Sequence, residues 1–276
     1  MIRNLKLTMA LAMIGFGVQA QPFLLKSTTG AKPFLMDIYY DSNGKGAYVK
    51  YRGQQGVISL QLKKQTILGK LSKLNVTYVW DEVVDGKVTG MYNLRQEGNE
   101  VSAASYLRHK DHKLFKLEQV KNQEDDFGKA GFLLHGIVLS FYKGMEEGLS
   151  FTYPDKVTKT VRLPGFDSPE PQRKGTIADY NFDGYDDVAF SIPDAGMGVY
   201  RTFTIYLYNP VSKRFGLLAE PNDARAKCSG FCDVTLDKKN RLLITACRGG
   251  ATWWSNVYKY TAFNQLKWIS SKKTGN

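Results

Sequence analysis

Apolar and polar residues alternate in twos along much of this chain, which is the pattern of half-buried β-strands. The alternation is clearest in GAYVKYRGQQGVISLQLKK (46–64), NVTYVWDEVVDGKVTGMYNL (75–94) and RTFTIYLYN (201–209). Asp85 and Gly86 separate two of these runs and predict a tight hairpin, whose central residues need a positive φ. Few segments look helical, and residues 121–132 are the most ambiguous, between a short helix and a polar loop. The pattern therefore predicts an all-β protein of antiparallel sheets, arranged as a sandwich or like a propeller.

The first 20 residues have a different pattern. Arg3 and Lys6 precede an apolar run over residues 7–18, and small residues precede Gln21. The run is too short for a membrane span, which needs about 20 apolar residues. Residues 1–20 are therefore interpreted as a cleaved signal peptide, and we expect a periplasmic protein that does not insert into the membrane.

Pro and Gly are concentrated at residues 164–171, where they interrupt the strand pattern. This stretch predicts a linker between an N-terminal β domain (22–163) and a C-terminal β domain (172–276). A single continuous β fold with a long surface loop is the alternative.

Charge narrows the class of partner. The chain carries a formal net charge of +12, and loss of Arg3 and Lys6 with the signal peptide leaves +10. Secretion disfavours nucleic acid as the partner. Because Lys and Arg are spread along the chain, a solvated basic surface is the default interpretation, and binding of an acidic protein or an anionic envelope polymer is the alternative. No motif of an enzyme is present, and the three His residues fit no common zinc spacing. We therefore expect a protein without catalytic activity, although two carboxylates distant in sequence would leave no signature.

The segment DYNFDGYDD (179–187) concentrates oxygen ligands in one tight loop. Gly184 permits a sharp bend, and the converging carboxylates would repel one another without a cation. The spacing predicts a Ca²⁺ site. An Asx-rich turn without metal is the alternative, and Phe190 stands where an EF-hand would have Glu. The predicted ligands are Asp179, Asn181, Asp183, the carbonyl of Tyr185, and Asp187.

The segment after this loop contains Gly196 and Gly198, which add no packing to a strand. They predict a projecting loop over residues 193–200, before the strand 201–209. A calcium ion at 179–187 would have a structural role, fixing the strands that lead to this loop.

Three cysteines follow, at Cys228, Cys232 and Cys247. A hairpin about residues 237–240 would bring Cys247 opposite residues 230–232. The sequence predicts a disulfide from Cys247 to either Cys228 or Cys232, consistent with an oxidising compartment.

The chain resembles a family of periplasmic proteins in three segments, DYNFDGYDD, GVYRTFTIYLYNPVSKRF and ACRGGATWWSNVYKYTAFNQLKWI. Its members include immunity proteins against the peptidoglycan-cleaving effectors of antibacterial type IV secretion systems. They are similar in fold to the periplasmic inhibitors of invertebrate-type lysozyme. The resemblance covers residues 175–270 and, more loosely, 40–120.

The resemblance implies that a protruding loop plugs the active-site cleft of a peptidoglycan hydrolase. The lysozyme inhibitors have a Ser-Gly-x-Tyr pattern in this loop. Gly198 and Tyr200 match it, whereas Met197 stands in place of Ser, which favours a muramidase effector or another glycan hydrolase over lysozyme. A calcium-stabilised envelope module that binds a glycan or an adhesion partner is the alternative function. The implied inhibitory residues are Asp194, Gly196, Met197, Gly198, Tyr200 and Arg201.

Overall fold

The computed structural model describes residues 22–30, 32–69, 75–120, 128–166, 173–194, 199–261 and 264–275. These residues form 20 strands and no helix, and every strand pairing is antiparallel. The predicted all-β class with antiparallel sheets is confirmed. Within the same ranges, no helix has the length and apolar character needed to span a membrane. The predicted signal peptide lies outside the described residues.

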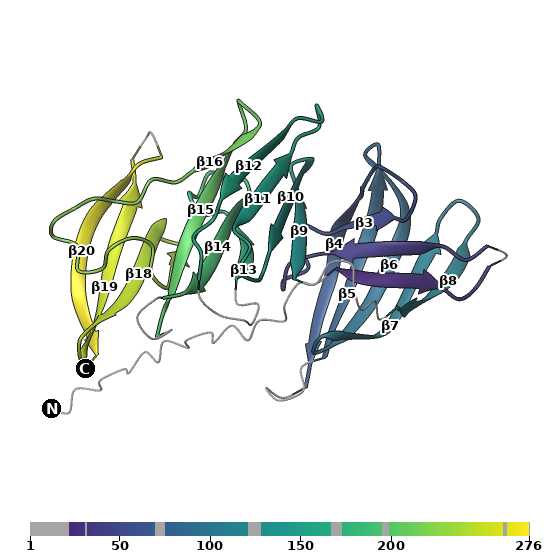
Figure 1. The fold of residues 1–276 in the computed structure, drawn as a ribbon, viewed down its shortest axis with the longest axis horizontal. Helices are drawn as coiled ribbons and strands as arrows, with labels where there is room; N and C mark the ends of the chain where they lie inside the picture. The colour runs from purple at the N-terminus through teal and green to yellow at the C-terminus, as the bar shows by residue number, and fades with distance from the viewer. Residues whose placement is uncertain are drawn as a thin grey trace, which may run out of the picture.

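The first eight strands form a closed barrel, in which β1 pairs with both β2 and β8 (Figure 1). Its alternating inward side chains build one core, dominated by aromatic residues such as Tyr40, Tyr78 and Trp80. The indole Nε1 of Trp80 donates to the carbonyl of Gly44 at 2.8 Å, so the buried polar atom is satisfied. The strands are β1 (Phe23–Ser27), β2 (Leu35–Tyr39), β3 (Tyr48–Tyr51), β4 (Ile58–Leu68), β5 (Asn75–Val84), β6 (Lys87–Glu97), β7 (Glu100–Arg108) and β8 (Lys113–Gln119).

The hairpin predicted at Asp85 and Gly86 is confirmed, because these residues join β5 to β6 and have φ values of 50° and 73°.

Three four-stranded sheets follow, each a meander of consecutive strands. Residues 121–127 of the ambiguous stretch lie outside the described residues, and its end enters β9. The first sheet contains β9 (Lys129–Leu134), β10 (Ile137–Tyr142), β11 (Gly148–Thr152) and β12 (Thr158–Arg162). The middle sheet contains β13 (Lys174–Ala178), β14 (Asp187–Pro193), β15 (Arg201–Asn209) and β16 (Arg214–Leu217). The last sheet contains β17 (Thr235–Asp237), β18 (Leu242–Gly249), β19 (Thr252–Tyr260) and β20 (Leu266–Gly275).

The middle sheet lies between the first and last sheets (Figure 1). Successive residues of a strand point to opposite faces. On β14, Val188 and Phe190 enter the core shared with the first sheet, and Ala189 enters the core shared with the last sheet. Six of the seven residues of β14 are buried as a result. The middle sheet thus packs against the first sheet with one face and against the last sheet with the other. The choice between a sandwich and a propeller-like arrangement stays a prediction.

The core between the first and middle sheets takes residues from both sides of the predicted linker, including Phe132 and Leu163 before it and Ile177 after it. Residues 167–172 of this region lie outside the described residues. The division into two domains at 164–171 stays a prediction.

Residues 45–46 are one of the places where the barrel meets the stack, and another is Gly131 on β9, which lies against Tyr48 and Tyr39. The N–H of Leu133 on β9 donates to the carbonyl of Gly46 at 2.8 Å. The backbone of Gly46 has φ +58°, and a Cβ there would lie 2.7 Å from Cδ1 of Ile177 and 3.1 Å from Cβ of Phe132. Only glycine fits this close approach between the barrel and the stack.

Candidate functional site

The predicted calcium loop, residues 179–187, connects β13 to β14 at one end of the middle sheet. Phe182 and Gly184 have positive φ values of 61° and 94°, which fold the connection into a tight turn. Gly184 occupies the bend that its spacing predicts. A Cβ at that position would have nothing within 4 Å, so backbone conformation, not space, favours glycine there.

Backbone N–H groups orient the carboxylates of the loop. The two oxygens of Asp179 accept hydrogen bonds from the N–H of Asp183 at 3.0 Å and of Gly184 at 2.9 Å. Oδ1 of Asp183 accepts from the N–H of Tyr185 at 2.9 Å, and Oδ2 accepts from the Asn181 amide at 2.9 Å. A carboxylate offers about four lone-pair sites, so each oxygen retains capacity for a cation.

Asp187 is fully buried and ties the loop to the neighbouring strand β15. Its oxygens accept hydrogen bonds from the N–H of Tyr180 at 2.8 Å and of Tyr208 at 2.7 Å. Burial is the main reason that the pKa of Asp187 is raised to about 7. The charges of Asp183 and Asp179 also raise it, and the two N–H donors oppose the shift.

The loop also contacts the other three sheets. The Nζ atom of Lys45, from the barrel, lies 2.6 Å from Oδ1 of Asp186. Nε2 of His135, from the turn between β9 and β10, lies 2.7 Å from the carbonyl of Asp186, and Nη2 of Arg241 donates to the carbonyl of Phe182 at 2.5 Å. Arg241 precedes β18. Residues 179–187 therefore join the barrel and all three sheets.

The chemistry of the donor set suits Ca²⁺, because all five predicted ligands offer oxygen. In the described part of the chain, Asp179, Asp183 and Asp187 form no ion pair with a Lys, Arg or His, so their charges are not compensated. Over the same residues, no three His, Cys, Asp or Glu side chains are gathered as a metal cluster. The calcium ligands therefore remain predicted.

Of the implied inhibitory residues, Asp194, Tyr200 and Arg201 are described, whereas Gly196, Met197 and Gly198 lie outside the described residues. Two hydrogen bonds close the base of this loop. The N–H of Asp194 donates to the carbonyl of Tyr200 at 2.9 Å, and the N–H of Tyr200 donates to Oδ1 of Asp194 at 3.0 Å.

Arg201 fixes the same base to a second segment. The backbone N–H of Arg201 donates to Oδ1 of Asp233 at 2.8 Å, and the N–H of Asp233 donates to the carbonyl of Arg201 at 2.8 Å. Its guanidinium donates to the hydroxyl of Ser191 at 3.0 Å and to the carbonyl of Ser191 at 2.6 Å. Burial lowers the pKa of Arg201, which leaves its charge intact. Arg201 is thus half-buried and held in place at the root of the loop.

The cysteines lie beneath this base. A disulfide joins Cys228 to Cys247, with the Cα atoms 5.6 Å apart, which confirms the predicted bridge and selects Cys228 as the partner. Cys232 is a buried free thiol whose Sγ donates to the carbonyl of Ser229 at 3.1 Å, and burial raises its pKa to about 11. The half-buried ring of Tyr200 packs against these cysteines, together with Trp254.

The calcium loop and the inhibitory loop lie at opposite ends of β14. Seven strand residues at about 3.3 Å each separate them by roughly 20 Å. A metal in the first loop therefore acts on the second only through β14 and its neighbours.

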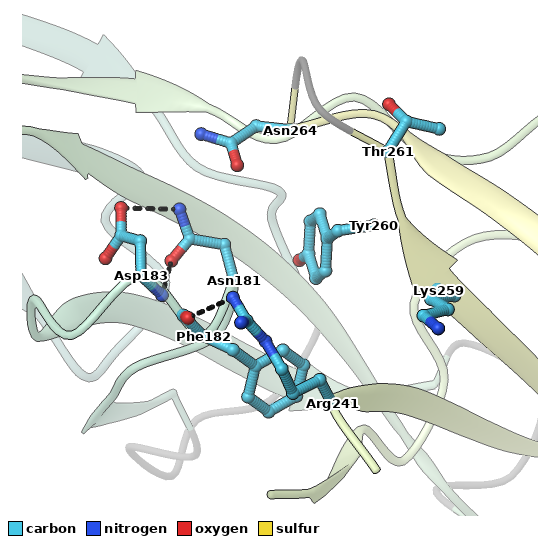
Figure 2. A pocket seen from close by; sticks show the side chains of 8 residues that line it. All are labelled: Asn181, Phe182, Asp183, Arg241, Lys259, Tyr260, Thr261 and Asn264. Carbon is cyan, nitrogen blue, oxygen red and sulfur yellow. Dashed lines mark hydrogen bonds between the residues drawn. The ribbon is translucent and has the colours of Figure 1, made fainter.

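Sequence reasoning missed a polar cavity beside the calcium loop (Figure 2). Asn181 and Asp183 form one side, and Arg241, Lys259 and Asn264 come from the last sheet and its turns. Nothing in the local sequence pattern relates these three segments, because only the stacking of the middle and last sheets brings them together.

No known family model matches the chain, and no curated protein matches it.

Proposed function

We propose that this protein is a periplasmic inhibitor, an immunity protein, that binds a peptidoglycan hydrolase and blocks its active-site cleft with residues 194–200. The observation that supports this proposal most directly is the closed base of the loop. Asp194 and Tyr200 are joined by two hydrogen bonds, and Arg201 is bonded to Asp233. A loop held at both ends loses less conformational entropy when it enters a groove.

The disulfide supports the same role. It stabilises the segment that includes Asp233, and the N–H of Ala246 donates to the carbonyl of Cys232 at 2.9 Å. The inhibitory loop is therefore anchored on a covalently linked hairpin rather than on a free connection. The bridge closes a loop with a sequence separation of 19 residues. By the chain-entropy estimate, closing such a loop stabilises the folded protein by about 3 kcal/mol.

Charge is consistent with such a target. Clefts that hydrolyse glycans have carboxylates at their floor. The positive net charge of this chain, +12 in full and +10 without residues 1–20, would accelerate encounter with an acidic groove. The proposed partner is a muramidase or lysozyme-like effector.

Calcium has a structural role in this proposal. Bound by the five predicted oxygen ligands, Ca²⁺ would neutralise the charges gathered at residues 179–187. It would thereby strengthen the point where the barrel and the three sheets meet. No part of the blocking contact is assigned to the metal.

Inhibition of peptidoglycan hydrolysis tests the blocking role. The variant Gly198→Asp places a side chain and a charge at the loop and is expected to raise the inhibition constant more than tenfold, because a cleft with acidic groups would repel it. Gly56→Asp is the matched control, since Gly56 is an exposed barrel residue with open space around its Cβ position. The hydrolases used are an invertebrate-type lysozyme and a purified muramidase effector.

Tyr200 is tested with two variants because its ring packs against the cluster of three cysteines. Tyr200→Ala is expected to weaken inhibition and to lower the melting temperature, whereas Tyr200→Phe keeps the packing and tests the hydroxyl alone. Full inhibition by Gly198→Asp and by Tyr200→Ala would show that the contact lies elsewhere on the surface.

A further inference from the structure

A cavity of about 490 Å³ lies between the calcium loop and the last sheet. This volume is within the range of about 300–1,000 Å³ that is typical of small-molecule sites. Figure 2 shows Asn181 and Asp183 on one side and Tyr260 and Asn264 across from them, whereas the guanidinium of Arg241 lies beside Asn181 and donates to the carbonyl of Phe182.

Of the side chains that line the cavity, two are cationic and one is anionic. Arg241 and Lys259 both line it, and neither forms a salt bridge within the described ranges. Arg241 uses one N–H for the carbonyl of Phe182, and a guanidinium has five. The only carboxylate in the lining is that of Asp183. The cavity therefore offers more donors and positive charge than it offers acceptors.

Tyr260 adds a polar group without a partner. Its hydroxyl oxygen is buried and has no hydrogen bond among the described residues. In Figure 2 this oxygen points toward Asn181. Leaving a buried hydroxyl unpaired costs roughly 1–3 kcal/mol. A ligand hydroxyl that reached it would recover this cost.

The rings of Phe182 and Tyr260 supply the apolar part of the lining, with centroids 6.2 Å apart in an edge-to-face arrangement. An occupant that suits this cavity carries a negative group for Arg241 and Lys259. It also carries hydroxyls for Tyr260 and the amides, and an apolar C–H surface for the rings.

We propose that the cavity binds a sugar that bears a carboxylate. This activity is separate from the blocking of a hydrolase, because the cavity lies at the end of β14 opposite to the inhibitory loop. The two can therefore succeed or fail independently.

Calorimetric titration of the intact protein with D-glucuronate and with D-glucose, in calcium-containing buffer, tests the proposal. The two sugars differ at one carbon, where glucuronate has the carboxylate. Glucuronate is expected to bind at least about tenfold more tightly, since a charged hydrogen bond contributes on this scale.

Lys259→Gln removes one cation and is expected to weaken glucuronate binding about tenfold. Lys272→Gln is the matched control, because Lys272 is an exposed lysine on β20 outside the cavity and is expected to leave binding unchanged. Tyr260→Phe removes only the unpaired hydroxyl. It is expected to reduce affinity and to raise the melting temperature, because the cost of burying an unpaired hydroxyl is removed.

Equal affinity for glucuronate and glucose, or no binding of either, would overturn the proposal. Wild-type affinity in both Lys259→Gln and Tyr260→Phe would do the same, because binding would then occur elsewhere. Inorganic phosphate is titrated in parallel. If phosphate binds as tightly as glucuronate, the cavity is a general anion site and the proposal of a sugar ligand is wrong.

Discussion

Arg173 shows how one side chain can hold several chain segments together. It is 1% exposed, and burial lowers its pKa while leaving it charged. Its fork of N–H groups satisfies carbonyls that would otherwise be buried without a donor. The four acceptors are the carbonyls of Tyr142 (2.7 Å), Gly144 (2.9 Å), Glu146 (2.5 Å) and Pro164 (2.8 Å).

Replacement of Arg173 with Lys keeps the positive charge but removes the planar, forked set of guanidinium N–H donors. We expect Arg173→Lys to lower the free energy of unfolding by about 1–3 kcal/mol, because an ammonium cannot reach all four carbonyls. Urea unfolding followed by circular dichroism measures the change. Arg162→Lys is the control, since Arg162 is exposed and its one ion pair among the described residues is with Glu147, and it should behave as wild type. Equal stability of both variants would contradict the role given to the fork.

Lys143 is also buried, but unlike Arg173 it has no hydrogen-bond acceptor for its charged group among the described residues. It is 3% exposed. Burial lowers its pKa to about 7. A buried unpaired charge destabilises the folded protein, so Lys143 costs stability wherever it is protonated in the fold.

The pH dependence of this cost has a definite sign. Below pH 7 Lys143 is charged in both states, and the burial penalty is fully present. Between about pH 7 and pH 10.4 the unfolded chain holds a proton that the folded protein has lost, so stability rises with pH. Lys143→Met is expected to be more stable than wild type by on the order of 2 kcal/mol at pH 6. This advantage should shrink as the pH rises through that window.

Urea unfolding at a series of pH values measures the difference between Lys143→Met and wild type, which cancels the other titrating groups. Lys159→Met, at an exposed position of β12, is the control and should show no such trend. A constant difference across the series would mean that Lys143 does not lose its proton in the folded state.

At the scale of elements, the connection 179–187 determines how the sheets are joined. It links β13 to β14, and it contacts Lys45, His135 and Arg241 from the three other sheets. A local change in this connection is therefore transmitted to the whole stack. This position explains why a structural metal would be useful there.

We expect calcium to raise the melting temperature of the wild-type protein. At a hundredfold excess over the dissociation constant, binding adds about 2.7 kcal/mol. For a chain of this length that corresponds to about 5–10 °C. Asp183→Ala should abolish the response, because it removes a predicted ligand. Differential scanning calorimetry with calcium and with a chelator measures both.

Asp111→Ala is the control for this experiment. Asp111 is an exposed carboxylate of the barrel that pairs with Arg108, so its loss should leave the calcium response intact. If the wild type has the same melting temperature with calcium and with chelator, the proposed calcium site is wrong.

At the scale of the whole molecule, the barrel and the sheet stack are joined through close backbone contact. Gly46 and Gly131 are two residues where this contact is close. An added Cβ would lie 2.7 Å from Cδ1 of Ile177 at Gly46 and 2.6 Å from the Tyr48 hydroxyl at Gly131. The ion pair between Lys45 and Asp186 is partly exposed and contributes little by comparison. Packing at positions such as Gly46 and Gly131, more than this ion pair, therefore holds the two parts together.

Two glycine variants separate packing from backbone strain. Gly46→Ala and Gly53→Ala both place a Cβ on a residue with positive φ, +58° and +85°, but only the first meets other atoms. We expect Gly53→Ala to cost about 1 kcal/mol and Gly46→Ala at least 1 kcal/mol more. Thermal unfolding measures both. Equal losses of stability in Gly46→Ala and Gly53→Ala would show that the atoms around Gly46 move aside for a Cβ without strain.

The alternation of side chains determined much of this structure locally. It predicted the strands, the turn at Asp85 and Gly86, and the hairpin that brings Cys247 to its partner. These features depend on interactions between residues close in the chain, and their patterns are therefore visible in the sequence.

Tertiary structure decided the rest. Closure of eight strands into a barrel, face-to-face stacking of three sheets, and the choice of Cys228 over Cys232 all depend on contacts between distant segments. The oxygen-rich loop was visible in the sequence, but its distance from residues 194–200 follows from the length and direction of β14. The cavity at Arg241 and Tyr260 depends on how two sheets pack, and no periodicity within either sheet encodes that packing.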